Sequence, residues 1–258
     1  MLPIETTDHK GSLVIIKRLG IVLLGVAAAI TLISCTAVSP RATTNASSIA
    51  PSEGKTDLKT VYSDLARAGG KVFTLDPHAS VIRIYAFRGG RAAKLAHNHV
   101  LAAPQFTGFF YLSPGGTSES RFDLEFRLDQ LEIDNPAYRA VLGSAFASVL
   151  SPQDRAGSRK HMLGEENLQA DRFPFVRIHS LQIAGDGTKF AAKVQVELHG
   201  QKCEMWVPLD VEGLPGRLSV TGSMVLRQTD FGAHPYSVLN GLIAVQNEVV
   251  VEFKLIGR

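Results

Sequence analysis

Two histidines separated by one residue, in the segment His97-Asn98-His99, are the side chains best placed for chemistry. In an extended backbone, side chains two positions apart share a face, so both rings could enter one Zn²⁺ or Cu²⁺ site. Such a site needs further ligands, and the other candidates are scattered along the chain: His161, His179, His199 and His234. We favour the plainer interpretation, in which the pair hydrogen-bonds to backbone in a tight turn, and keep a metal- or redox-associated role as the alternative.

No nucleophile with an accompanying base is evident from the sequence. Cys203 lies in an expected strand beside Trp206, without a basic cluster to activate the thiol, and the chain has no Gly-x-Ser-x-Gly elbow. Asp134 and Asp154 are expected to be turn or cap residues. The sequence therefore predicts a protein that is not an enzyme, and a hydrolase or isomerase is the least favoured alternative.

The elements that must position these residues are mainly β-strands. Segments rich in β-branched and aromatic residues, separated by Gly and Pro turns, follow one another from Lys71 onward. Strict alternation from Arg121 to Leu131 puts Phe122, Leu124 and Phe126 on one face and charged side chains on the other. The expected strands cover 71–75, 80–88, 105–112, 121–131, 175–183, 188–199, 202–212, 217–227 and 247–255.

A helical insertion interrupts the strands between residues 135 and 168. Asn135-Pro136 has the form of a helix cap followed by proline at the first helical position. Apolar residues from Tyr138 to Leu150 recur at three- and four-residue steps, which predicts one long amphipathic helix. A second, more polar helix is expected over Asp154 to Leu168.

About eight or nine strands with short connections favour an antiparallel barrel, because closure removes exposed sheet edges. A barrel of about eight strands can hold one small ligand in its interior or can be filled by its own side chains. The pattern alone leaves both open. Alternation assigns eight residues to shared faces that could line the interior: Phe106, Phe110, Leu112, Phe122, Leu124, Phe126, Val176 and Ile178.

The amino-terminal region has the features of an export signal. Lys10, Lys17 and Arg18 precede Leu19–Ile33, a run of fifteen apolar or small residues. That run suits a signal-peptide core and falls short of the about 18 residues that favour a membrane span. It ends in Leu-Ile-Ser-Cys35, which resembles a bacterial lipobox with an acylated cysteine.

We therefore expect residues 1–34 to be a lipoprotein-type signal peptide and Cys35 to carry the lipid anchor. Residues 35–57, rich in Ser, Thr and Ala, are expected to form a flexible tether, and 58–70 a short amphipathic helix. The expected location is the periplasmic face of a bacterial membrane. The outer membrane is preferred, because Thr36 is not an aspartate-type retention signal.

Charge and cysteine content narrow the functions further. The chain has a net charge of +3, and residues 1–34 hold three basic and two acidic side chains, which leaves +2 for the rest. Nucleic-acid binding needs a concentrated basic stripe, so we expect no nucleic-acid partner. The chain has only two cysteines, and if Cys35 is acylated no internal disulfide can form, so the fold must depend on its core.

Several short motifs, in this order, give residues 71–258 a resemblance to the YceI-like family of bacterial periplasmic proteins. They are Phe73-Thr-Leu-Asp76-Pro77, Phe106-Thr-Gly108 with Phe110, Ala170-Asp171-Arg172-Phe173-Pro174, and Gln228-Thr-Asp230-Phe231-Gly232. The chain departs from the usual pattern where Ala79 separates His78 from Ser80.

The resemblance implies a lipocalin-like antiparallel barrel that binds a polyisoprenoid or another long amphiphilic lipid in an apolar channel. It implies no required cofactor beyond that lipid, and for some members a membrane cytochrome of the b561 type as partner. On this basis the eight face-sharing residues become candidates for the channel lining. Contact with a lipid headgroup becomes a third role for His97 and His99.

Overall fold

The computed structural model of the protein describes residues 57–258. The expected signal peptide, the Cys35 anchor and all but the last residue of the expected tether lie outside the described residues. Within residues 57–258, no helix combines the length and the apolar character needed to cross a membrane.

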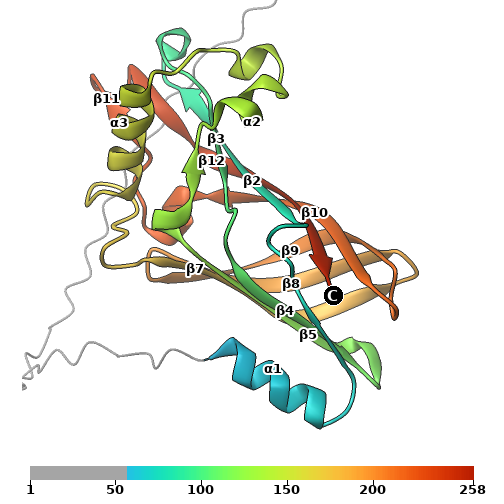
Figure 1. The fold of residues 1–258 in the computed structure, drawn as a ribbon. Coiled ribbons are helices and arrows are strands. Elements are labelled where there is room, and N and C mark those ends of the chain that lie inside the picture. The colour runs from blue at the N-terminus through green and yellow to red at the C-terminus, as the bar shows by residue number, and fades with distance from the viewer. Residues whose placement is uncertain (1–56) are drawn as a thin grey trace, which may run out of the picture. The chain divides into compact units, whose positions relative to one another are not determined.

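One antiparallel sheet contains about half of the described residues (Figure 1). Its strands are β1 Lys71–Thr74, β2 Val81–Gly89, β3 His99–Ala102, β4 Thr107–Ser113, β5 Gly116–Arg127, β6 Glu132–Ile133, β7 Phe175–Asp186, β8 Lys189–Leu198, β9 Gln201–Glu212, β10 Leu218–Arg227, β11 Ser237–Val238 and β12 Ile243–Gly257. Three α-helices accompany it, α1 Leu58–Arg67, α2 Pro136–Ala140 and α3 Pro152–Leu163.

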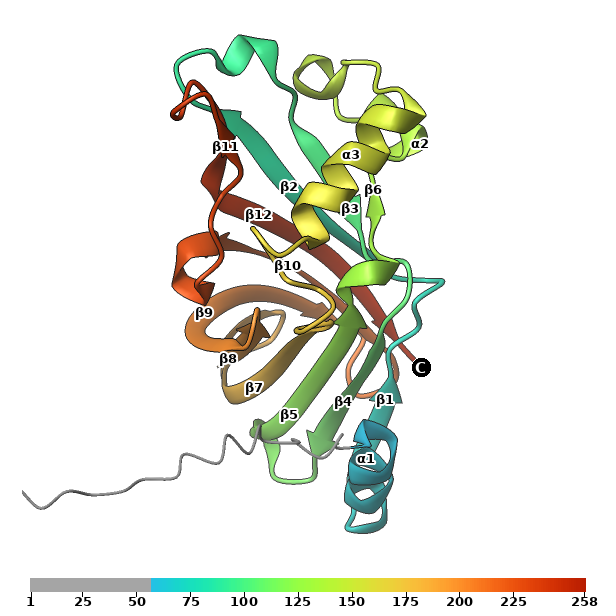
Figure 2. The same ribbon diagram turned by 90° about the vertical axis from the view of Figure 1, so that its left-hand side faces the viewer.

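The strands pair in the order β1-β4-β5-β7-β8-β9-β10-β12-β2-β3-β6, and the sheet curls on itself (Figure 2). Thr74 and Arg258 exchange backbone hydrogen bonds of 2.8 and 3.0 Å, so β1 also pairs with the end of β12. Eight strands therefore form a closed ring around the end of the interior where Thr74 pairs with Arg258. They are β1, β4, β5, β7, β8, β9, β10 and β12. The predicted antiparallel barrel of about eight strands with a helical insertion is confirmed.

Alternation along each strand decides which side chains enter the interior. Opposite one another on the inner face are Phe110 and Phe122, Leu124 and Ile178, and Phe126 and Val176. On the outer face Arg177 bridges Glu125 of β5 and Glu197 of β8, at 2.6 and 3.0 Å. Cross-strand pairs of this kind stabilise a sheet and fix its register, because a slip of one residue would exchange the faces.

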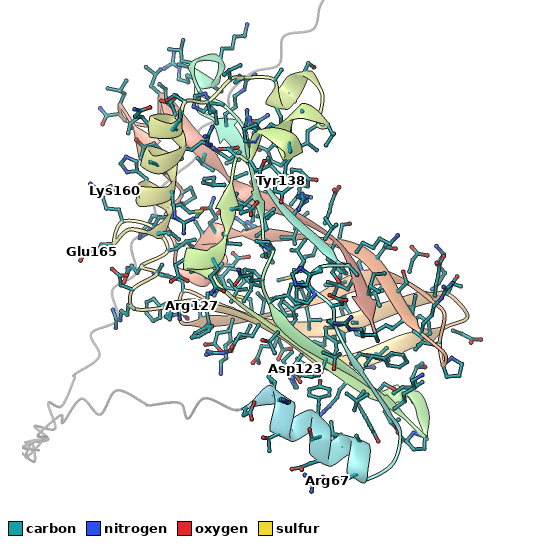
Figure 3. All side chains as sticks on the ribbon, in the orientation of Figure 1. Arg67, Asp123, Arg127, Tyr138, Lys160 and Glu165 are labelled. Carbon is teal, nitrogen blue, oxygen red and sulfur yellow. The ribbon has the colours of Figure 1, made fainter. Side chains whose placement is uncertain are left out.

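Helix α1 covers the outer face of β4. Asp57 caps the helix, and Tyr62 is buried with its ring stacked on Phe109 at 5.1 Å between centroids. The Tyr62 hydroxyl donates to Asp123 Oδ2 at 2.7 Å, and His179 Nδ1 lies 2.6 Å from Asp123 Oδ1. Figure 3 shows Asp123 on the side of the sheet that faces α1.

The insertion differs from its prediction. The long amphipathic helix expected from Tyr138 to Leu150 is wrong, since α2 ends at Ala140 and a 3₁₀ turn, Ser144–Phe146, follows. Gly143 lies between them with φ +73°, a left-handed conformation that interrupts the helix. Val141 and Val149, expected on the apolar face, are 82% and 96% exposed. Helix α3 starts as a capping box in which Ser151 is the N-cap and Asp154, expected as a turn or cap residue, accepts a hydrogen bond from the Ser151 N–H. The helix ends at Leu163.

The segment His97-Asn98-His99 also differs from its prediction as a tight turn. His99 begins strand β3, which pairs with β2 and β6 and was not predicted, as β6 and β11 were not. These strands have two to four residues, too few for a period-two pattern to be recognised.

Candidate functional site

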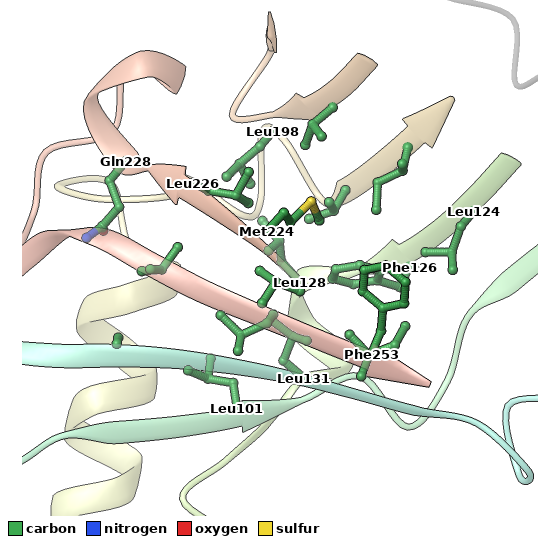
Figure 4. Close-up of a pocket in the computed structure, with 18 of the residues that line it drawn as sticks. Leu101, Leu124, Phe126, Leu128, Leu131, Leu198, Met224, Leu226, Gln228 and Phe253 are labelled. Atoms are coloured by element: carbon green, nitrogen blue, oxygen red, sulfur yellow. The ribbon is translucent and has the colours of Figure 1, made fainter. Parts of the chain in front are cut away.

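The barrel encloses an apolar cavity of about 490 Å³. This volume lies within the range of about 300–1,000 Å³ typical of small-molecule sites. Its walls come from the inner faces of the strands, from α3 and from the segment that precedes β3. Figure 4 shows Leu101 of β3, Leu124 and Phe126 of β5, Met224 and Leu226 of β10, and Phe253 of β12 converging on it.

Six of the eight residues predicted for the interior line this cavity: Phe110, Phe122, Leu124, Phe126, Val176 and Ile178. Phe106 and Leu112 pack against the same core but are not part of the cavity wall. Gly108 lies between Phe106 and Phe110 in the sequence. A Cβ there would lie 2.7 Å from Leu75 Cδ1, so the glycine makes room for a core leucine.

No Asp, Glu, Lys or Arg of the described residues lines the cavity. The polar side chains on its wall are His97, His99, Thr117, Ser158, His161, Asn167, Gln228 and Tyr236. Except for Thr117, they come from the start of β3, from α3 and the turn after it, and from the 3₁₀ helix and loop that lead to β11. Tyr236 packs on His161 with ring centroids 4.9 Å apart, which joins two of these segments. The cavity therefore has an apolar body and one end where polar side chains other than Asp, Glu, Lys and Arg gather.

His99 is held by a buried carboxylate at this polar end. Its Nδ1 lies 2.6 Å from Asp134 Oδ2, and Asp134 is fully buried. Asp134 Oδ1 accepts hydrogen bonds from Val100 N–H at 3.1 Å and from Arg139 at 2.6 Å. Arg139, itself 6% exposed, also donates to the carbonyl oxygens of Asn98 and Ser148. This Arg139–Asp134–His99 network joins β3, the turn after β6 and α2.

The charges in the network follow from these contacts. Burial opposes ionisation of Asp134, but the hydrogen bonds from His99, Val100 and Arg139 outweigh it and lower the pKa of Asp134 below its ordinary 3.8. Burial, and then the neighbouring His99 ring, lower the pKa of His97 below its ordinary 6.5. Asp134 is thus ionised and paired with Arg139 at neutral pH, and His97 is neutral.

From the sequence, Asp134 was expected to be a turn or cap residue, and Arg139 was given no role. Asp134 does have a turn-like φ of +49°, and Asn135 caps α2 as expected. The partners of Asp134 lie 35 positions before it and five after it, so no local pattern could show the network. The only available signal was a charged residue between Ile133 and a helix cap. Such a residue can belong to a turn or to a buried charge network.

The predicted histidine pair is close in space but has no further ligand. The rings of His97 and His99 contact edge to face, with centroids 5.6 Å apart. Within residues 57–258, no group of three or more His, Cys, Asp or Glu side chains is arranged to hold a metal ion. Of the scattered histidines, His179 pairs with Asp123 on the outer face and His199 pairs with the Phe231 carbonyl, while His161 lies on the cavity wall.

Exposed leucines lie beside the polar end. Leu95 and Leu239 are 75% and 69% exposed, and Leu242 is 38% exposed. A backbone hydrogen bond of 2.7 Å from Ala92 to Leu242 holds their two segments together. Residues 86–99 and 232–247 contain no acidic residue, while Arg91 and Lys94 are exposed. We call Leu95, Leu239 and Leu242 the apolar rim. Leu95 joins this rim to the cavity, because it also lines the cavity wall.

A family model and one solved structure identify the fold of this chain. A family model described as the YceI-like domain matches residues 73–256. No curated protein matches this chain. Among solved structures, BcnA of Burkholderia cenocepacia is 14% identical with a TM-score of 0.53, and the match covers 71% of this chain and 99% of that chain.

Two further structures are more distant. A polyisoprenoid binding domain from Saccharophagus degradans, implicated in plant cell wall breakdown, is 13% identical with a TM-score of 0.46, covering 72% of this chain and 97% of that chain. A Campylobacter jejuni YceI protein is 8% identical with a TM-score of 0.43, covering 61% and 84%. The likeness to BcnA shows a shared fold.

Proposed function

The chain belongs to the YceI-like family, and from that premise we propose that it is a binding or carrier protein that holds one long, largely apolar lipid in its barrel cavity. The observation that carries the proposal is the cavity of about 490 Å³ whose wall, among the described residues, contains no charged side chain. A wall of this kind favours a hydrocarbon chain over water. An isoprenoid-type tail agrees with the resemblance of the sequence motifs to the family.

Burial of apolar surface supplies the binding energy. Each Å² of ligand removed from water contributes roughly 25 cal/mol, so about 400 Å² gives about 10 kcal/mol before the loss of ligand freedom is subtracted. The polar groups at one end of the cavity add orientation, because a lipid with one polar end places that end against them.

We extend the proposal to location. Export, acylation of Cys35 and attachment to the periplasmic face of a bacterial membrane, the outer membrane by preference, would keep the barrel beside the source of its ligand. The apolar rim supports this, because exposed leucines flanked by Arg91 and Lys94 suit contact with a bilayer that contains anionic lipid. A b561-type membrane cytochrome as partner rests on the family resemblance alone.

A hydrolytic function finds partial support in the His99–Asp134 pair, which has the geometry of a base and the group that orients it. A nucleophile is the missing part. Within the described residues, no side-chain hydroxyl is hydrogen-bonded to the His99 ring. Binding without catalysis therefore remains the better proposal.

The test is the lipid content of protein purified in mild detergent from the membranes of the cells that make it. We expect extraction and mass spectrometry to find one lipid class at close to one molecule per chain. The variant Ile178→Trp places a larger side chain on the cavity wall and is expected to hold less of that lipid, whereas Leu181→Trp, at a 43% exposed position of the same strand, keeps it. Lipid-free wild type, or equal lipid in both variants, would refute the proposal.

A further inference from the structure

The cavity wall restricts the charge of the ligand headgroup. A phosphate or carboxylate moved out of water needs a cation or several hydrogen-bond donors, and without them its burial costs several kcal/mol or more. The described residues place no Lys or Arg on the wall. Arg139, the cation of the His99 network, is 6% exposed, and its Nη1 is bound to Asp134 and to the Asn98 carbonyl. The wall thus offers no Lys or Arg to balance the charge of an anionic headgroup.

The network also decides which nitrogen of His99 carries the proton. An ionised carboxylate can only accept hydrogen bonds, so His99 Nδ1 must donate to Asp134 Oδ2 across the 2.6 Å contact. In the neutral ring, Nε2 is then an acceptor. Because Arg139 already balances the charge of Asp134 at 2.6 Å, the carboxylate does not require a second cation beside it.

His99 Nε2 is available to a ligand. The His99 ring is on the cavity wall, its side chain is 16% exposed, and no hydrogen bond to Nε2 is present among residues 57–258. The position of the ring is fixed, because Asp134 is held in turn by Val100 N–H and by Arg139. An oriented acceptor at the end of an apolar cavity discriminates among ligands by whether they carry a donor.

The neighbouring His97 supports the same selection. Its ring lies edge to face with His99, and burial lowers its pKa, so it adds no positive charge at neutral pH. His97 therefore adds no cation to the cavity wall at neutral pH.

We propose that the cavity selects an uncharged lipid whose polar end carries a hydroxyl, an isoprenoid alcohol or phenol by class, and that this hydroxyl donates a hydrogen bond to His99 Nε2. The inference rests on the proposed lipid-binding function and names the headgroup that this site takes. His99 is the residue that contacts the headgroup, while Asp134 and Arg139 are positioning residues that set the tautomer.

Three probes with the same tail test the inference: geranylgeraniol, its methyl ether and geranylgeranyl diphosphate. Each competes with a fluorescent apolar probe bound to the delipidated full chain in detergent micelles. We expect the alcohol to bind about tenfold more tightly than the ether, which corresponds to about 1.4 kcal/mol, and the diphosphate to bind more weakly than both. Only the alcohol can donate to Nε2, and only the diphosphate brings charge.

In His99→Leu the alcohol and the ether are expected to bind equally, at the affinity that the ether has for wild type. Unchanged ether binding shows that the variant is folded. His78→Leu is the matched control, because it changes an exposed histidine that does not line the cavity, and it is expected to keep the preference for the alcohol.

If His99→Leu does not fold, the wild-type ranking still decides. Equal binding of alcohol and ether, or tightest binding of the diphosphate, overturns the headgroup inference. If none of the three probes binds, the proposed lipid-binding function fails instead, so the two failures are distinguishable.

Discussion

At the scale of single residues, the site depends on a carboxylate that the sequence does not reveal. His97 and His99 were recognisable as neighbours in one short segment, and they do meet on the cavity wall. Asp134 and Arg139 become their partners only because β6 and α2 return to the start of β3. Side chains that meet through tertiary contacts leave no spacing in the sequence, so the network could not be predicted.

Asp134→Ala is expected to destabilise the protein by about 3–5 kcal/mol, because it leaves Arg139 buried without its counter-charge. Arg139 Nη2 already lacks a partner in the described part of the chain, so the remaining contacts cannot absorb the loss. Urea unfolding followed by circular dichroism measures the change.

Asp129→Ala is the control, since Asp129 forms an exposed pair with Arg127 that contributes about 0–1 kcal/mol. An equal decrease in unfolding free energy in the two variants would show that the buried network stabilises the protein no more than the exposed pair does.

At the scale of elements, alternation along long strands was the informative pattern. Residues 121–131 alternate cleanly, and β5 does carry Phe122, Leu124 and Phe126 toward the cavity. The prediction of one long helix in the insertion was wrong for a local reason. Apolar residues from Tyr138 to Leu150 keep a three- and four-residue spacing across Gly143, although the backbone has left the helix there. Hydrophobic periodicity therefore located long strands well and judged the short elements of the insertion poorly.

The contact between α1 and the barrel predicts a dependence on pH. The hydrogen bond to Asp123 raises the pKa of His179 above its ordinary 6.5, despite partial burial. For a group whose pKa rises on folding, the stabilisation is complete below the unfolded pKa of about 6.5 and is lost as pH increases through the folded value. We therefore expect this contribution to stability to decline above about pH 6.5.

The measurement is the unfolding free energy of wild type and of His179→Gln between pH 6 and 9. The difference in unfolding free energy between the two proteins is expected to shrink as pH rises. The difference between them in the protection of β4 amides from hydrogen exchange is expected to shrink in the same way. A difference that stays constant or grows with pH would contradict the assignment.

At the scale of the whole molecule, the fold class followed from the sequence but the cavity did not. Counting strands and turn residues gave a barrel, while a barrel of this size can be hollow or solid. The register that aligns Phe110 with Phe122 and Leu124 with Ile178, and the volume left between such pairs, emerge only when all strands are in place.

The apolar rim predicts how the ligand is exchanged. Replacing Leu95, Leu239 and Leu242 together by Ser is expected to slow lipid transfer between vesicles containing anionic phospholipid by about tenfold or more, since the rim would no longer enter the interface. The matched control is Val225→Ser, which changes a 56% exposed residue on β10 and should leave the rate unchanged. Equal rates for the triple variant and wild type would exclude the rim as the contact.

The proposed anchor predicts membrane attachment through Cys35. Cys35→Ser is expected to move the protein from the membrane fraction to the soluble periplasmic fraction, or to leave the precursor unprocessed, when cells are fractionated. An unaltered distribution with normal processing would remove the basis for a lipid anchor.

The central claim is that the barrel holds a lipid whose polar end lies at His99. The most direct test is an experimental structure of the protein purified with its native lipid in mild detergent, without a delipidation step. We expect elongated density that follows the apolar wall past Phe126 and Phe253 and ends beside His99 Nε2. Density for ordered water alone in the cavity, or for a lipid with its polar end directed away from His99, would contradict it.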